Sequence, residues 1–130
     1  MAERIAYMGM TPSEAANISD EQYIKLLKSR YRRSVKRNAL KYRILKQRIE
    51  EAKKFGSDKP IKTHVREAVI LPSWIGTKIS VYNGKEFQQL TISANMLGHR
   101  LGEYVYSTKR VIHSSPGIRA TKGSKFTEVK

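Results

Sequence analysis

The clearest pattern in the chain is a stripe of apolar residues that recur every three or four positions between residues 24 and 52. This spacing is typical of one face of an α-helix. Just before the stripe, Ser19-Asp-Glu-Gln22 has the form of a capping box, in which the first and last side chains satisfy free backbone N–H groups. We therefore expect a helix to begin at Ser19. Its apolar stripe comprises Ile24, Leu27, Tyr31, Val35, Tyr42, Leu45, Ile49 and Ala52.

The predicted helix has one weak point and a clear end. The apolar stripe is weakest at Arg37-Asn38, where a kink or a break into two helices is expected. Gly56 suits the left-handed position that follows a helix, and Pro60 cannot continue one. The helical segment should therefore stop shortly after residue 55.

The two ends of the chain lack a regular pattern. Gly9 and Thr11-Pro12 act as breakers, so residues 1–18 are expected to form an irregular arm. The first ten residues include one acid, Glu3, and no long apolar run, unlike a signal peptide. Residues 107–130 are basic, contain Gly and Pro, and have little periodicity, which predicts a tail that is ordered only against a partner.

After the linker the pattern changes to that of β-strands. Residues Ile61–Leu71 are rich in β-branched side chains and are expected to form a strand. Apolar and polar residues alternate on both sides of Asn83-Gly84, a strong signal for a type I′ hairpin turn, whose two central residues need positive φ. A short helix is expected from Ser93 to Leu97. The predicted fold is α+β, with a helix or helix pair packed on a small antiparallel sheet containing a β-hairpin, followed by a basic extended tail.

Three further positions have predicted packing roles. Trp74 is expected in the core or against the hairpin. Gly98 and Gly102 are expected at close turns of the backbone.

The composition fits one domain with a strong positive charge. The chain has 130 residues, of which 39% are hydrophobic, enough for a modest core. Its formal charge of +15 is divided unevenly: residues 1–24 sum to −3, residues 25–54 to +11 and residues 55–130 to +7. A segregated basic excess of this size is typical of nucleic-acid-binding proteins.

The basic excess is concentrated in residues 28–48, which contain ten Lys or Arg and no acid. In a helix, pairs such as Arg32/Lys36 and Arg33/Arg37 would repel by about 0.2–0.5 kcal/mol each. A merely solvated face usually mixes both signs, and a membrane-surface or calmodulin-binding helix needs a broad apolar face with Trp, Phe and Leu. Phosphate backbone fits best, because guanidinium groups bind phosphate oxygens bidentately. This pattern favours RNA over DNA only weakly.

Catalytic and metal-binding patterns are not evident. His64, His99 and His113 are far apart in sequence and lack neighbouring acids at metal-ligand spacing, so no metal site is expected. The two aspartates, Asp20 and Asp58, fall in a predicted cap and a linker, which leaves poor material for a Ser-His-Asp arrangement. No nucleotide-binding loop is visible, and no cofactor is expected. The chain contains no cysteine, which excludes disulfides and thiolate metal sites. No window approaches the roughly 18 apolar residues of a membrane span, and an intracellular protein is expected.

The stretch Tyr82–Ser107, YNGKEFQQLTISANMLGHRLGEYVYS, resembles the signature of small-subunit ribosomal protein nineteen. Residues Lys59–Lys85 are similar to that family's strand, proline turn and hairpin, and His113–Phe126 resembles its C-terminal tail. Near the N-terminus, Tyr7–Met10 and Ile18–Arg37 more loosely resemble the longer archaeal and eukaryotic-type branch.

The resemblance implies a non-catalytic structural protein of the small ribosomal subunit, located in the cytoplasm on the ribosome. It implies binding to ribosomal RNA in the subunit head, beside ribosomal protein thirteen, with the tail directed toward the decoding region and the transfer RNA sites. No membrane partner is implied. The segments would be the arm 1–18, the basic helical segment 19–55, the family core 59–106 and the tail 107–130.

The candidate RNA-binding residues fall into three groups. The helical group, expected to bind phosphates, is Arg30, Arg32, Arg33, Lys36, Arg37 and Lys41. The hairpin and turn group, expected to shape a second RNA surface, is Lys62, His64, Arg66, Asn83, Gly84, Lys85, His99 and Arg100. The tail group, which the resemblance places near transfer RNA, is Lys109, Arg110, His113, Arg119 and Lys122.

Two other functions remain open from the residues alone. A free architectural protein that binds DNA or RNA would have the same basic segment. An enzyme would need a pocket with perturbed titratable groups, for which His99 and Glu103 are the available candidates.

Overall fold

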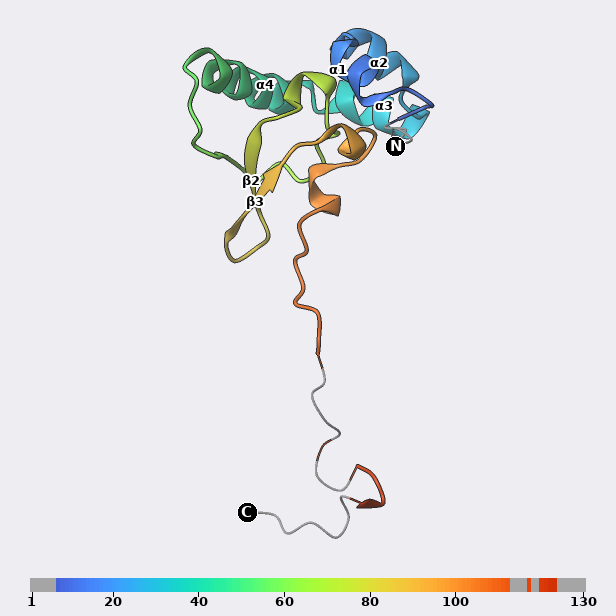
Figure 1. Ribbon diagram of the computed structural model, residues 1–130, viewed down its shortest axis with the longest axis vertical. Helices are drawn as coiled ribbons and strands as arrows, with labels where there is room; N and C mark the ends of the chain where they lie inside the picture. Colours follow the sequence, from blue (N-terminus) through green and yellow to red (C-terminus); the bar gives the residue numbers. More distant parts are fainter. Residues whose placement is uncertain (1–6, 113–116, 118–119, 124–130) are drawn as a thin grey trace.

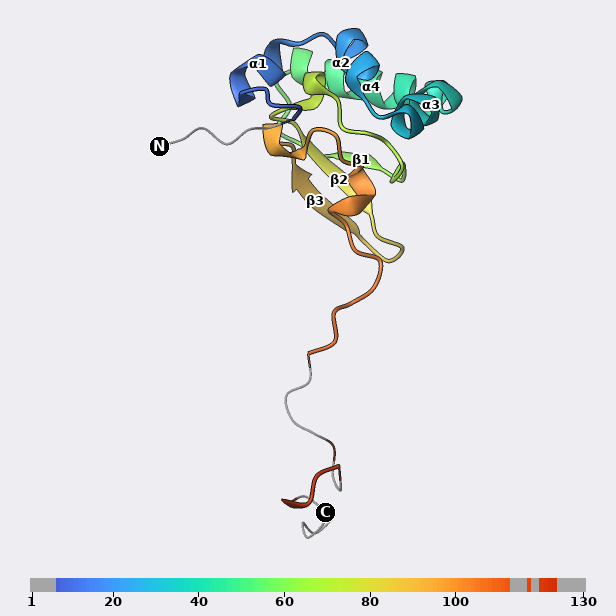
Figure 2. The same cartoon turned by 90° about the vertical axis from the view of Figure 1, so that its right-hand side faces the viewer.

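The computed structural model describes residues 7–112, 117 and 120–123. Within that part, helices form a layer over a three-stranded sheet, and residues 107–112 lead away from this domain (Figures 1 and 2). The α-helices are α1 (Pro12–Asn17), α2 (Asp20–Leu26), α3 (Ser29–Arg37) and α4 (Ala39–Lys54). The strands are β1 (Ile61–Thr63), β2 (Lys78–Tyr82) and β3 (Phe87–Thr91). Short 3-10 helices lie at Pro72–Trp74, Ala94–Met96 and Leu101–Glu103. The α+β prediction is confirmed.

The predicted basic helical segment is three helices. Ser19 caps α2 as predicted, since its side chain accepts a hydrogen bond from the Gln22 backbone N–H at 3.4 Å, but the reciprocal bond of a capping box, from Ser19 N–H to the Gln22 side chain, does not form in this part of the structure. The predicted break at Asn38 is confirmed, and this residue separates α3 from α4. A second break, at Leu27, was not predicted; its backbone is extended, with ψ of 149°, and its side chain is buried. The Leu27 side chain packs in the core at this break. No Gly or Pro lies there to indicate the break in the sequence.

The expectation of an irregular arm over residues 1–18 is wrong for its last part. The Thr11 side chain accepts from the Glu14 N–H, and the Glu14 carboxylate accepts from the Thr11 N–H. This is a complete capping box, and Pro12 occupies the first turn, where its missing N–H costs nothing. Thr11-Pro12 therefore begins a helix rather than preventing one.

Helix α4 ends where Gly56 was expected to end it. Gly56 has a φ of +58°, its N–H donates to the Lys53 carbonyl, and the Ser57 N–H donates to the Ala52 carbonyl. These two bonds form a Schellman motif, which satisfies carbonyls at the end of the helix.

The sheet is mixed rather than antiparallel. Strand β2 pairs with β3 in the antiparallel sense but with β1 in the parallel sense, in the order β1-β2-β3. The strand expected over Ile61–Leu71 covers only Ile61–Thr63. Four consecutive residues, 68–71, are all buried, so the chain leaves the alternating pattern of a strand there and enters the core. Within this buried stretch, Val69 forms an isolated antiparallel bridge with Arg100, which lies outside the three strands.

The predicted hairpin is present, but its turn is shifted by one residue. The Asn83 N–H donates to the Glu86 carbonyl, so Gly84 and Lys85 are the central residues. Gly84 alone takes positive φ, at +104°, and the expected type I′ turn on Asn83-Gly84 is wrong. The shift is explained by the Asn83 side chain. Its oxygen accepts hydrogen bonds from the N–H groups of Lys85 and Glu86, and these bonds stabilise a turn in which Asn83 is the first residue.

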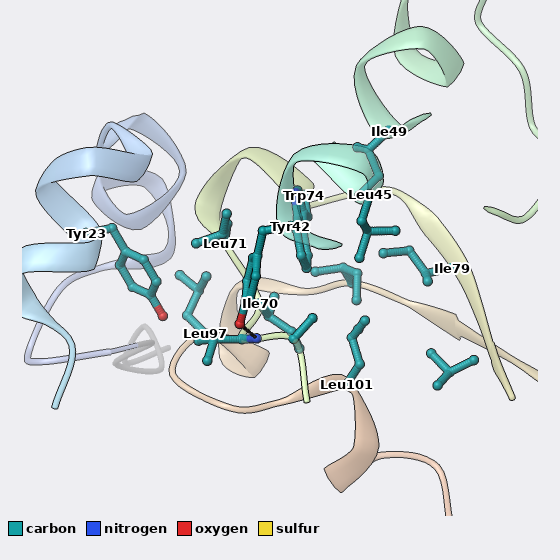
Figure 3. Close-up of a cluster of buried hydrophobic side chains, with 14 of the residues drawn as sticks. Tyr23, Tyr42, Leu45, Ile49, Ile70, Leu71, Trp74, Ile79, Leu97 and Leu101 are labelled. Atoms are coloured by element: carbon teal, nitrogen blue, oxygen red, sulfur yellow. Dashed lines mark hydrogen bonds between the residues drawn. The ribbon is translucent and has the colours of Figure 1, made fainter. Parts of the chain in front are cut away.

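The core lies between α4 and the sheet (Figure 3). Tyr42, Leu45 and Ile49 descend from α4 and meet Trp74 and Ile79, which confirms the predicted burial of Trp74. The Tyr42 hydroxyl accepts a hydrogen bond from the Val69 backbone N–H at 2.6 Å, a second link between α4 and the segment before the first 3-10 helix.

The segment around Leu101 is held by close backbone contact. The Gly102 N–H donates to the Arg66 carbonyl at 2.8 Å, and a Cβ on Gly102 would lie 3.0 Å from that oxygen. At Gly98 a Cβ would collide with the ring of Tyr7. The positive φ of Gly98, +79°, fits the predicted close backbone turn, and Gly102 lies in the 3-10 turn Leu101–Glu103. The predicted short helix after Ser93 is also present, although it is a 3-10 turn.

Candidate nucleic-acid interface

Helix α3 has no buried residue and carries most of the predicted phosphate-binding side chains. Arg30, Arg33 and Arg37 are three or four positions apart and therefore lie on one face. They line an open groove of about 430 Å³ together with Arg100, which is far away in sequence. We call this site the arginine groove; its lining is Ser29, Arg30, Arg33, Ser34, Arg37, Asn38 and Arg100.

Arg100 is fixed at the groove by its backbone and by a neighbouring ring. Its backbone pairs with Val69 in the isolated bridge. Its guanidinium carbon lies 4.8 Å from the centre of the Tyr31 ring, a cation–π contact between α3 and the loop. Its Nε is buried and has no hydrogen-bond partner among the described residues. A buried donor of this kind is costly unless a partner, such as a ligand oxygen or water, binds it.

A second groove, of about 410 Å³, continues from the first and shares Arg30 and Arg100 with it. Its other lining residues are Tyr31, Arg66, Glu67, Gly102 and Glu103. The Arg66 guanidinium donates to the Val105 carbonyl at 2.7 Å, which holds this arginine in place. From the sequence we predicted that Arg66 and Arg100 lie on a different surface from the α3 candidates. In the structure both residues line the same grooves as α3 residues.

The remaining helical candidates do not all face the arginine groove. Arg32 and Lys36 line a separate hollow of about 280 Å³ with Ser29 and Arg33. Lys41 instead forms an ion pair with Glu67, with 2.8 Å between Nζ and Oε1. This hydrogen bond from Lys41 is the main cause that lowers the pKa of Glu67 below its ordinary value.

The hairpin candidates form another part of the surface. Lys62 and His64 are exposed and lie beside the rings of Tyr82 and Phe87. The remaining three candidates, Asn83, Gly84 and Lys85, are at the turn between β2 and β3.

His99 and the tail candidates lie outside both groups. The His99 Nδ1 is 2.6 Å from a Glu103 carboxylate oxygen, and its ring meets Tyr104 edge to face. The tail residues Lys109, Arg110 and Lys122 are exposed. His113 and Arg119 lie outside the described residues.

The charges of the described residues are paired selectively. Each ion pair joins an acid to a lysine or a histidine, as in Lys46 with Asp20 and Lys78 with Asp58. Within the described ranges no arginine forms an ion pair. The arginine groove therefore keeps an excess of positive charge, although Glu67 and Glu103 line the adjoining groove, and it is suited to an anion.

Several residues at the interface were not predicted from sequence. Tyr31, predicted in the apolar stripe, packs against the core and also supports Arg100, and Ser29, Ser34 and Asn38 line the groove. Their hydroxyl and amide groups are hydrogen-bond donors that line the same groove as the arginines. Their helical spacing relative to Arg30, Arg33 and Arg37 could have placed them there from the sequence. Tyr82 and Phe87 were also not singled out, although their positions on either side of the hairpin turn place them opposite each other.

The described residues contain neither a cluster of metal ligands nor a helix that could span a membrane. No three His, Asp or Glu side chains gather there as metal ligands. None of the helices in residues 7–112 is both long and apolar enough to cross a bilayer.

Comparison with known proteins decides the family. The model of the family described as ribosomal protein S19 matches residues 33–113. The chain belongs to the ribosomal protein S19 family. A relative from Saccharolobus solfataricus, small ribosomal subunit protein uS19, is 46% identical over 95% of this chain and 90% of its own length. Proteins of the same name from Metallosphaera sedula and Nitrosopumilus maritimus are each 39% identical, over 98% and 100% of this chain and 93% and 100% of their own lengths.

Membership in the S19 family confirms the resemblance found in the sequence. The chain has a structural role in the small ribosomal subunit, is ribosome-bound in the cytoplasm, and is not an enzyme. The relatives span almost the whole chain, and all three come from organisms of the branch that the N-terminal residues resembled.

Proposed function

We propose that this S19-family protein binds small-subunit ribosomal RNA through the arginine groove, in the head of the subunit near the transfer RNA sites. The observation that carries the proposal is the convergence of Arg30, Arg33 and Arg37 with Arg100 at one groove without a carboxylate partner in the described part. A polyanion supplies the charge that this site lacks.

The chemistry of the groove favours phosphate over other anions. Each guanidinium presents several N–H donors in a planar fork, which matches two oxygens of one phosphate. Hydroxyl groups of Ser29 and Ser34 add neutral donors on the same face. Because such contacts fix the position of the protein without reading bases, they suit a structural component of a large RNA particle.

The finer placement within the subunit is also part of the proposal. The exposed basic residues of the tail would contact transfer RNA, and ribosomal protein thirteen would be the neighbouring protein. Exposure of Lys109, Arg110 and Lys122 supports the first of these assignments. The second rests on the family resemblance.

Salt dependence tests the groove. The variant Arg30→Gln/Arg33→Gln/Arg37→Gln should weaken binding to small-subunit ribosomal RNA and reduce the slope of log K against log salt by roughly 2 to 3, at about 0.7–0.9 per phosphate contact. The matched control Lys25→Gln/Lys54→Gln/Lys59→Gln removes the same charge from exposed positions elsewhere. Equal slopes for both variants would contradict a specific role for the groove.

Deletion tests the tail. Removing residues 116–130 should leave binding to free ribosomal RNA nearly intact and lower the affinity of transfer RNA for small subunits reconstituted with the shortened protein. Unchanged transfer RNA affinity and unchanged translation would contradict a role for the deleted candidates, Arg119 and Lys122, and leave the groove assignment standing.

A further inference from the structure

Three aromatic rings form a compact triangular cluster at one end of the sheet. His64 follows β1, Tyr82 ends β2, and Phe87 begins β3. The ring centres are 4.8 Å apart for His64 and Tyr82, 5.1 Å for Tyr82 and Phe87, and 5.2 Å for His64 and Phe87. We call these three residues, with Lys62, the aromatic platform.

The platform is on the sheet face that points away from the helices. Ile79 and Val81 of β2 face α4 and are fully buried, and they pair with Ile61 and Thr63 of β1. Side chains alternate between the faces of a strand, so Lys62, His64 and Tyr82 point to the opposite face. Figure 2 shows the strands beneath the helical layer, with their other side away from it.

The platform is accessible and positively charged. His64 and Lys62 are exposed, and Phe87 keeps 36% of its surface exposed although it is a large apolar residue. The Lys62 ammonium lies 5.4 Å from the centre of the Phe87 ring, and Lys85 is exposed at the adjoining turn. The His64 and Phe87 rings meet edge to face, and each is tilted against Tyr82, so the three rings do not stack on one another and their exposed surfaces stay available beside a cation.

We propose that the aromatic platform stacks one unpaired RNA base on the open side of His64 and Phe87, while Lys62 binds the phosphate of the same nucleotide. The inference rests on the proposed RNA binding and adds a second mode of contact to it. Bases in a duplex are covered by their neighbours, whereas an unpaired base can lie against an aromatic ring, as on the sheets of other RNA-binding domains. The site would therefore select single-stranded or bulged segments.

Charge decides between a nucleotide and a protein segment as the occupant. An apolar protein segment would bury Phe87 but would also remove water from Lys62 without giving it an anion, which is costly. A nucleotide offers a flat aromatic base and a phosphate at the same time, and it matches both parts of the platform. Stacking also tolerates any base, so the expected preference is for unpaired structure rather than for sequence.

The test uses the full-length protein and three labelled single strands of equal length: oligoadenylate, an abasic strand of the same charge, and oligoadenylate with one 2-aminopurine. The wild-type protein should bind oligoadenylate more tightly than the abasic strand and should change the 2-aminopurine fluorescence. Phe87→Leu and His64→Ala should each weaken oligoadenylate binding about five-fold or more and leave abasic binding nearly unchanged. Phe55→Leu, at an 83% exposed phenylalanine after α4, is the matched control.

The outcomes separate this inference from the proposed function. Equal binding of the adenylate and abasic strands by the wild-type protein would overturn the platform, as would Phe87→Leu and His64→Ala variants that bind like Phe55→Leu. A Phe87→Leu protein that only loses thermal stability would point to a structural role for the rings, and His64→Ala, at an exposed side chain, then decides. Failure of the groove variant to change the salt slope would instead sink the proposed function, whatever the platform does.

Discussion

The hydroxyl group of Tyr42 offers a sharp test of how α4 holds the loop beneath it. Tyr42 is 6% exposed, its ring stacks against Trp74 at 6.4 Å between centres, and its hydroxyl accepts the Val69 N–H at 2.6 Å. The substitution Tyr42→Phe keeps the ring and its packing. It removes only the acceptor and leaves a buried backbone N–H without a partner.

The expected magnitude follows from that unsatisfied group. A buried donor that loses its partner costs about 1–3 kcal/mol. For a domain of about 100 residues, each kcal/mol lowers Tm by roughly 4–8 °C. Tyr42→Phe should therefore lower Tm by at least about 4 °C. Because Val69 also pairs with Arg100, the loss should weaken RNA binding at the arginine groove as well.

Urea unfolding, followed by circular dichroism, measures the change in free energy. The matched control is Tyr106→Phe, which removes the same hydroxyl from a side chain that is 75% exposed. The control should change stability by less than about 0.5 kcal/mol, as surface substitutions usually do. A Tyr42→Phe protein as stable as this control would refute the reasoning that the Val69 bond stabilises the fold.

Three further predictions follow from the charges and the buried tyrosines. Glu67→Gln should strengthen RNA binding up to about five-fold at low salt, since it removes a carboxylate from the second groove and frees Lys41; a filter-binding titration that shows weaker binding would contradict this. Burial raises the pKa of Tyr23 and of Tyr42 above the ordinary 10.0. The neutral tyrosines therefore contribute their full stability below pH 10, and this stability should be lost as the pH rises through the raised pKa values. Unfolding curves measured at increasing alkaline pH test this loss. Added salt should raise the free energy of unfolding of the RNA-free protein by roughly 0.4–1 kcal/mol, because it screens Arg32/Lys36 and Arg33/Arg37; a fall would argue against repulsion within α3.

The sequence predicted the ends of helices well where neighbouring residues alone determine them. The Ser19 cap, the break at Asn38 and the end at Gly56 depend on neighbouring residues only, and all three are present. Helix α1 has an equally local signal in Thr11-Pro12-Ser-Glu14, which we interpreted as a breaker although Pro is tolerated in the first turn of a helix. The break at Leu27 is different, since it accompanies packing of that side chain in the core.

Long-range pairing accounts for most of the rest. Parallel pairing of β1 with β2 joins segments that are separated by a loop and a 3-10 helix, and no local pattern encodes its direction. The same holds for the arginine groove. The sequence identified Arg30 and Arg100 as RNA-binding candidates, but only the fold brings them to one groove, through the Val69 bridge and the Tyr31 ring. Which charges are neutralised within the chain, as Lys41 is by Glu67, likewise depends on the fold.

The distribution of ion pairs explains how the chain tolerates its charge and keeps it available. The breaks at Leu27 and Asn38 confine α3 to nine residues, so only two pairs of like charges four apart, Arg32/Lys36 and Arg33/Arg37, remain within one helix. Within the described ranges Glu67, Asp20 and Asp58 form ion pairs with lysines, and no acid forms one with an arginine. Arginine keeps its charge at any physiological pH and binds phosphate in a planar fork, whereas lysine is a point charge on a flexible stem. An acid paired with lysine therefore stabilises the fold and leaves the arginine donors free to bind phosphate. The same acid paired with an α3 arginine would occupy donors that RNA needs.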